Sequence, residues 1–152
     1  MDEHIKFMQV ALREAEKARE KAEVPIGAVI VRDGVVIARA HNTKNQHRNA
    51  LKHAEMLVID KAIKKTGDWR LNDCDLYVTL EPCPMCAGAC INARLRSVIF
   101  GAYDEKAGCC GTLYNLPTDT RFNHRPQVIG GVCEAECAGI LSDFFKNLRK
   151  KD

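Results

Sequence analysis

The sequence predicts an α/β fold in which a mixed sheet carries helices on both faces. Three observations support this prediction. Apolar residues recur at helical spacing near both ends of the chain, and short β-rich runs alternate with helical segments between them. An Asp-Gly pair, Asp33-Gly34, joins the first two β-rich runs as a tight antiparallel hairpin. Strand–helix–strand units follow, and these give parallel neighbours, so the sheet should be mixed.

The first third of the chain opens with a helix and continues into the hairpin. Residues 5–18 place apolar side chains at helical spacing, and Val24-Pro25 ends that helix. The two hairpin strands should span residues 28–31 and 35–38. A polar loop then covers residues 42–52.

The remaining elements alternate between helix and strand. A helix over residues 54–65 should end at Gly67, since glycine is common just past helix ends. In order, there follow a buried strand 76–80, a helix 84–93, a strand 97–100, a long loop 101–126, a strand 127–132 and a helix 134–150. No repeat or linker interrupts this order, so we expect a single domain over residues 1–152.

Composition indicates a globular protein of the cytoplasm. The 152 residues are 46% hydrophobic and 28% charged, and the N-terminus lacks a signal-peptide pattern. The net charge of +3 permits a nucleic-acid partner without requiring one. A basic cluster ends the chain: Lys146, Arg149, Lys150 and Lys151. Such cations either complement the helix macrodipole or contact phosphates.

The segment EPCPMC, residues 81–86, favours a metal site. Proline is tolerated in the first turn of a helix, so Pro82 and Pro84 indicate a helix that begins here. Cys83 and Cys86 then lie on one face of that turn, where the helix N-terminus favours the metal-binding thiolate. A redox pair is the alternative interpretation of C-x-x-C.

His53 and Glu55 complete the predicted site. If the two helix starts converge, His53, Cys83 and Cys86 provide the nitrogen and sulfur ligands that zinc prefers. Three protein ligands leave a fourth position open to water, as in catalytic zinc sites. Residues two apart in a helix point in different directions. His53 and Glu55 can therefore both approach one metal only if His53 lies before the regular helix. Glu55 is then free to move protons.

These motifs resemble the bacterial tRNA-specific adenosine deaminases of the cytidine-deaminase-like superfamily. The resemblance extends over most of the chain. Its segments are EVPIGAVIV (23–31), HAEM (53–56), LYVTLEPCPMCAGA (76–89), VIFGAYDEKAGCCG (98–111), NHR (123–125) and LSDFF (141–145). The resemblance implies a three-layer α/β/α sandwich with a mixed five-stranded sheet, a homodimer and one zinc ion per subunit. It also implies that the wobble adenosine of a tRNA anticodon is converted to inosine.

The resemblance further implies roles for individual residues. His53, Cys83 and Cys86 would bind zinc, and Glu55 would be the proton shuttle. The substrate-binding residues implied are Asn42, Val24, Pro25, Ala54, Asp104, Lys106, His124, Arg125, Phe144, Phe145 and Arg149. Asn42 would hydrogen-bond the flipped base, and Val24 and Pro25 would form the pocket wall. The loop and C-terminal helix residues would contact the anticodon stem-loop.

One segment departs from the family pattern, and two other functions stay open. Members usually approach the histidine through Asp-Pro or Asp-Ala, whereas this chain has Asn49-Ala50-Leu51-Lys52. Lys52 would face either solvent or an RNA phosphate. The alternative enzyme is a deaminase of a free base, nucleoside or nucleotide, such as guanine or cytidine. The non-enzymatic alternative is an RNA-binding partner that keeps zinc for its structure.

Overall fold

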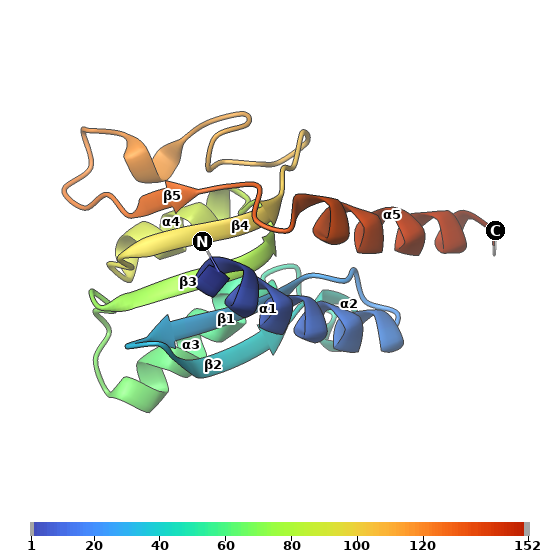
Figure 1. Ribbon diagram of the computed structural model, residues 1–152, viewed down its shortest axis with the longest axis horizontal. Coiled ribbons are helices and arrows are strands. Elements are labelled where there is room, and N and C mark those ends of the chain that lie inside the picture. Colours follow the sequence, from blue (N-terminus) through green and yellow to red (C-terminus); the bar gives the residue numbers. More distant parts are fainter. Residues whose placement is uncertain (1, 151–152) are drawn as a thin grey trace.

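The structure, a computed structural model, describes residues 2–150 and has the predicted alternation of helices and strands (Figure 1). Its elements are α1 (Asp2–Glu20), β1 (Gly27–Arg32), β2 (Val35–His41), α2 (Lys44–His47), α3 (Ala54–Thr66), β3 (Cys74–Leu80), α4 (Pro84–Asn92), β4 (Ser97–Ala102), the 3-10 helix η1 (Leu116–Thr118), β5 (Gln127–Ile129) and α5 (Glu134–Lys150). No helix in this range is long and apolar enough to cross a membrane. Lys151 of the basic cluster lies outside the described residues.

The strands form one mixed sheet in the order β2-β1-β3-β4-β5. β1 pairs antiparallel with both β2 and β3, whereas β3, β4 and β5 are parallel neighbours. The predicted hairpin is confirmed: Asp33 and Gly34 have φ of 52° and 74°. Positive φ at both central residues is typical of the two-residue turn that matches strand twist.

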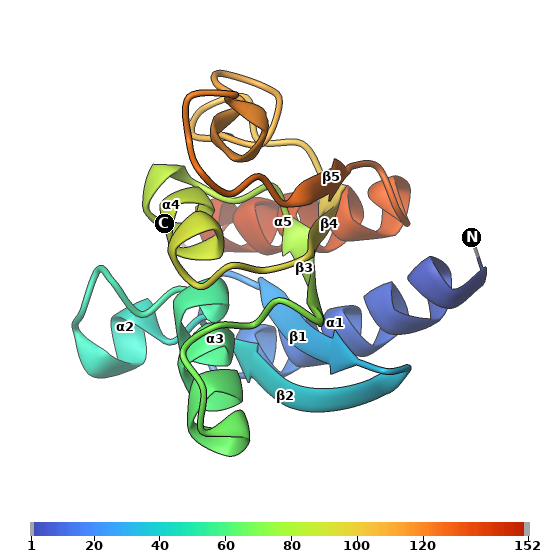
Figure 2. The same ribbon diagram turned by 90° about the vertical axis from the view of Figure 1, so that its left-hand side faces the viewer.

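Side chains of alternating strand residues divide the core into two layers. Ala28 and Ile30 of β1 pack with α3 and α4, whereas Val29 and Val31 pack with α1 and α5. This division follows from the period of two in a strand, which sends successive side chains to opposite faces. Figure 2 shows the sheet nearly edge-on between the two pairs of helices. The predicted three-layer α/β/α sandwich with a mixed five-stranded sheet is therefore confirmed.

The sheet topology brings several chain segments to one end of the strands. β3 and β4 are parallel, so their carboxyl ends lie at the same end of the sheet, where α3 and α4 begin. The C-terminal half of α5 extends beyond the sheet on the side where β2 ends (Figure 1). Three elements differ from expectation: the polar loop contains the short helix α2, the long loop contains the 3-10 helix η1, and β5 is only three residues long.

Candidate metal centre and active site

Two helix starts carry the predicted metal ligands. His53 directly precedes α3 with an extended backbone, φ −77° and ψ 151°. The prediction that His53 stands before the regular helix is thus confirmed. Cys83 precedes α4 in the same way, with φ −74° and ψ 176°, and Pro84 is the first helical residue. Cys86 follows within the first turn, where backbone N–H groups favour a thiolate.

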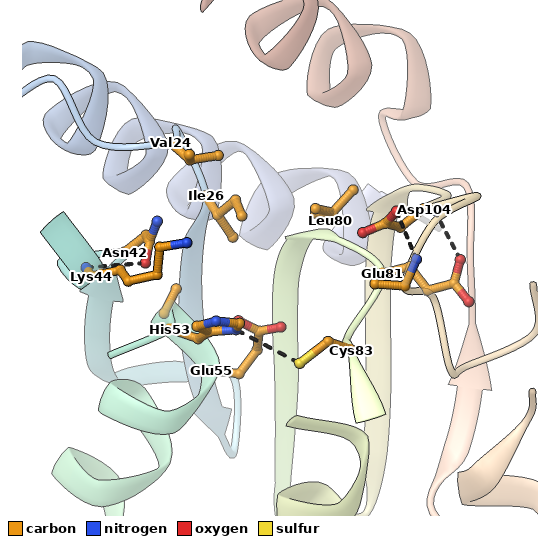
Figure 3. A pocket seen from close by; sticks show the side chains of 12 residues that line it. Val24, Ile26, Asn42, Lys44, His53, Glu55, Leu80, Glu81, Cys83 and Asp104 are labelled. Atoms are coloured by element: carbon orange, nitrogen blue, oxygen red, sulfur yellow. Dashed lines mark hydrogen bonds between the residues drawn. The ribbon is translucent and has the colours of Figure 1, made fainter. Parts of the chain in front are cut away.

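The three side chains meet at one point. Within residues 2–150, His53, Cys83 and Cys86 form the single group of potential metal ligands whose donor atoms all lie within 4.8 Å of one another. Nδ1 of His53 is 3.7 Å from Sγ of Cys83, a contact that Figure 3 marks with a dashed line. The same nitrogen is 3.6 Å from Sγ of Cys86. Ligands held about 2.0 and 2.3 Å from a tetrahedral zinc would be about 3.6 Å apart. The donor set and its spacing therefore fit zinc.

The two sulfur atoms differ in their affinity for a proton. The hydrogen bond from Cys86, aided by His53, lowers the pKa of Cys83 to about 4. The same hydrogen bond, together with burial, raises the pKa of Cys86. The two thiols are therefore coupled, and a metal would bind both as thiolates, because metal ligands must be deprotonated.

Glu55 lies beside this cluster in a buried position. Its side chain is only 4% exposed, and burial raises the pKa of its carboxyl group to about 7. The negative charge at Cys83 raises it further, whereas the nearby His53 lowers it. A carboxyl group that titrates near neutral pH is suited to take up and release protons.

A cavity of about 180 Å³ opens onto the cluster. This volume is below the roughly 300–1,000 Å³ of pockets for drug-sized ligands, so the cavity suits a single base. The residues lining it are Val24, Ile26, Asn42, Lys44, His53, Ala54, Glu55, Leu80, Glu81, Cys83, Asp104 and Ala107 (Figure 3). Its walls come from the segment before β1, the residues after β2, the end of β3, the starts of α3 and α4, and the loop after β4.

The sequence predicted some of these cavity residues and missed others. Among the predicted substrate-binding residues, Val24, Asn42, Ala54 and Asp104 line the cavity; Asp104 was predicted as a stem-loop contact. Pro25 is buried next to them but does not line it. The residues missed are Ile26, Lys44, Leu80, Glu81 and Ala107. Glu81 adjoins the cysteine motif and Lys44 follows Asn42 by two positions, so proximity to the motifs was the available signal.

Some of the predicted RNA-contact residues lie near the cavity. Lys106 and Phe145 line a neighbouring hollow that shares Val24, Leu80 and Asp104 with it. Phe144 lines a separate hollow between the end of α1 and α5. Arg149 is exposed on the last turn of α5.

His124 and Arg125 lie elsewhere in the fold. The His124 ring nitrogen Nε2 is 2.7 Å from the backbone oxygen of Leu95, which precedes β4. The guanidinium of Arg125 donates to the backbone oxygen of Phe122 at 2.8 Å. Because the cavity lies where β4 ends, these two residues are at the opposite end of the same sheet.

The cysteines outside the cluster pack in the apolar core. Cys74, Cys90, Cys109 and Cys110 belong to the core layer under α3 and α4. Cys137 of α5 is buried in the other core layer, and the half-buried Cys133 packs against that layer.

Comparison with known proteins gives consistent matches. The family model described as MafB19-like deaminase matches residues 1–149. A tRNA-specific adenosine deaminase from Bacillus subtilis is 58% identical over 145 residues, covering 95% of this chain and 90% of the relative. A solved structure from a study of A-to-I editing by tRNA:A34 deaminases at the wobble position of transfer RNA superposes with a TM-score of 0.85. It is 46% identical, and the match covers 90% of this chain and 99% of that one.

A guanine deaminase from Bacillus subtilis is a more distant match. Its TM-score is 0.63 and its identity 36%, over 74% of this chain and 71% of the other. The similarity is therefore greater, in both sequence and structure, to the proteins named for tRNA than to this guanine deaminase.

Proposed function

Because this chain belongs to the MafB19-like deaminase family and is related over almost its whole length to tRNA-specific adenosine deaminases, we propose that it deaminates adenosine to inosine at the wobble position of a tRNA anticodon. The reaction is a hydrolysis that releases ammonia. One observation carries the proposal: two thiols and an imidazole converge beside a buried carboxyl group, at the floor of a cavity sized for one base.

The proposed metal is zinc, held by His53, Cys83 and Cys86. The donor types and their spacing of 3.6–3.7 Å support this assignment. When bound, zinc supplies Lewis-acid chemistry that makes water nucleophilic near neutral pH. The two cysteines lie at the N-terminus of α4, whose positive dipole end favours thiolate.

Glu55 is the proposed proton carrier. Its carboxylate takes a proton from the attacking water as the water oxygen bonds to C6 of adenine. It then delivers a proton to the ring nitrogen N1, and a further transfer lets the amino group leave as ammonia. Burial of Glu55 supports this role, because its pKa of about 7 lets the group act as both base and acid.

The walls of the cavity would hold and orient the base. The Asn42 side chain is 5% exposed and lines the cavity, so its amide is placed to hydrogen-bond the ring edge. Val24 and Ala54 add apolar surface to the cavity wall. Because an anticodon adenosine is already unpaired, moving it into this cavity requires little unstacking energy.

The proposed partner is a tRNA anticodon stem-loop, bound by a homodimer in the cytoplasm, where tRNA is used. Single-stranded RNA is recognised through splayed bases, stacking and phosphate contacts. Lys106 and Phe145, beside the cavity, remain predicted contacts, as do Phe144 and Arg149 elsewhere on α5. His124 and Arg125, at the opposite end of the sheet, also stay predicted contacts with the stem-loop.

Product analysis with a defined set of substrates tests the proposal. The purified protein is incubated separately with an anticodon stem-loop carrying adenosine at the wobble position, the same stem-loop with adenosine moved one position, free adenosine, cytidine and guanine. Inosine should form only in the first RNA. Turnover of guanine alone would favour the free-base alternative, and no turnover of any substrate by zinc-loaded protein would favour the RNA-binding alternative.

A further inference from the structure

Glu81 is buried, and donors from the loop of residues 104–112 hydrogen-bond to both oxygens of its carboxylate. It directly precedes the Pro82-Cys83 motif and is 2% exposed. Oε1 accepts hydrogen bonds from the backbone N–H of Asp104, at 3.0 Å, and from the hydroxyl of Thr112. Oε2 accepts from the backbone N–H groups of Cys110 and Thr112, both at 3.0 Å. A carboxylate has about four acceptor sites, so none is left for substrate or solvent.

The loop packs closely around this carboxylate. Gly108 lies against it, and a Cβ added at Gly108 would overlap the carboxyl carbon of Glu81. The backbone N–H of Cys109 also donates to the oxygen of Pro82 at 2.9 Å. The loop is therefore joined directly to the segment that carries Cys83.

Glu23 makes the equivalent contacts on the other side of the cavity. It is 1% exposed and directly precedes Val24, which lines the cavity. Its Oε1 accepts the backbone N–H of Asn45 at 3.0 Å, and its Oε2 accepts that of Gln46. These donors belong to α2, the short helix that follows Asn42 and begins at Lys44.

Both carboxylates depart from the usual way of burying a charge. Buried carboxylates are normally paired with a cation, but no Lys or Arg in residues 2–150 forms an ion pair with either group. Hydrogen bonds to an ionised acceptor are stronger than neutral ones, so each group holds its loop firmly without a flexible cationic side chain.

We propose that Glu23 and Glu81 are paired positioning residues, which fix the two opposing rims of the substrate cavity through backbone hydrogen bonds. Glu23 fixes the rim that carries Asn42 and Lys44, and Glu81 fixes the rim that carries Asp104 and Ala107. Neither group touches the reacting atoms. The expected effect on inosine formation rests on the proposed function. The claim that the two carboxylates hold the loops in place does not depend on it.

Positioning by these groups should affect turnover more than folding. A misplacement of about 1 Å far from the reacting atoms can slow a reaction on the order of 100-fold. In Glu81→Gln, an amide nitrogen replaces one oxygen and faces backbone N–H donors, so one pair of hydrogen bonds is lost while the shape is kept. In Glu23→Gln, each oxygen position accepts only one α2 amide, so a single hydrogen bond is lost.

Amide hydrogen exchange and single-turnover kinetics on zinc-loaded protein test the proposal together. In Glu81→Gln, the amides of Asp104, Cys110 and Thr112 should exchange at least about tenfold faster, while those of Asn45 and Gln46 keep their wild-type rates. Glu23→Gln should show the reverse pattern. In both variants, inosine formation in saturating stem-loop should slow at least about tenfold, with zinc content unchanged.

Two further variants are controls, one for loss of folding and one for a general effect of losing a carboxylate. Thr112→Val removes only the hydroxyl donor to Glu81 and should speed exchange at Asp104 by a smaller factor. Asp75→Asn is the matched control. This carboxylate lies on β3 at the end away from the cavity and accepts side-chain hydrogen bonds from Arg96 at 3.0 and 2.8 Å. It should change neither the rim amides nor turnover.

Two results would overturn the proposal. Faster exchange at all amides together would show that the carboxylates only stabilise the whole fold. Faster exchange confined to the rim with unchanged turnover would show that the rims need not be fixed. If the wild type forms no inosine, the proposed function fails, but the exchange pattern still decides whether the carboxylates hold the loops.

Discussion

Neutralising the exposed cations of the last turns of α5 should weaken RNA binding in a salt-dependent way. The perturbation is the triple variant Lys146→Gln, Arg149→Gln and Lys150→Gln. Residues three and four apart share a helix face, so the three cations form one exposed stripe. Within residues 2–150 none of them forms an ion pair, so all three are available to phosphates.

The number of cations removed sets the size of the expected effect. Each phosphate contact with single-stranded nucleic acid adds about 0.7 to the slope of log affinity against log salt. Loss of three contacts should reduce that slope by about 2. Between 50 and 200 mM salt, the wild type should therefore lose about 16-fold more affinity than the variant.

Fluorescence anisotropy with a labelled anticodon stem-loop, repeated across salt concentrations, measures the slope. The charge-matched control replaces Lys64, Lys65 and Arg70, which are exposed near the end of α3 away from the cavity. The control should keep the wild-type slope. Equal slopes for wild type and the α5 variant would refute the reasoning and leave the cations only their interaction with the helix macrodipole, worth about 0.3–1 kcal/mol each.

Three other perturbations have defined outcomes. Replacing His53, Cys83 or Cys86 with Ala should reduce bound zinc well below one per chain, measured by mass spectrometry of the metal, because two ligands hold zinc far less tightly than three. Asn42→Ala should lower kcat/KM for the stem-loop about 10-fold to 100-fold without changing zinc content, since a buried hydrogen bond to the base is lost. Burial lowers the pKa of His41 below its usual 6.5, so the unfolded state binds more protons and stability falls as pH drops below about 6.5. The Tm of His41→Asn should therefore change less than that of the wild type between pH 7.5 and 5.5, and parallel Tm curves would contradict this.

The sequence predicted features that depend on local backbone chemistry. The turn at Asp33-Gly34 needs positive φ, and both residues adopt it. Gly67 ends α3 in the left-handed conformation, with φ of 75°. The proline at position 84 begins α4, which places Cys83 just before the helix. Each of these preferences acts over a few residues, so it can be recognised without knowing the rest of the fold.

Features that depend on contacts between distant segments were not predictable in this way. Glu81 is 23 residues from Asp104 and 31 from Thr112, and its buried role depends on the loop folding back over it. The short helix α2 has no periodic pattern; its backbone is held by Glu23, more than 20 residues earlier. β5 ends after three residues because it pairs only with the first half of β4. The position of His124 beside Leu95 likewise depends on how the long loop crosses the end of the sheet.

Zinc content and inosine formation, measured together on Glu55→Ala, test the central claim most directly. The claim is that three side chains hold the metal while Glu55 only moves protons. The variant should retain one zinc per chain and form inosine at least about 100-fold more slowly than the wild type. Loss of the metal would show that Glu55 is a ligand, and retained turnover would show that another group carries the protons.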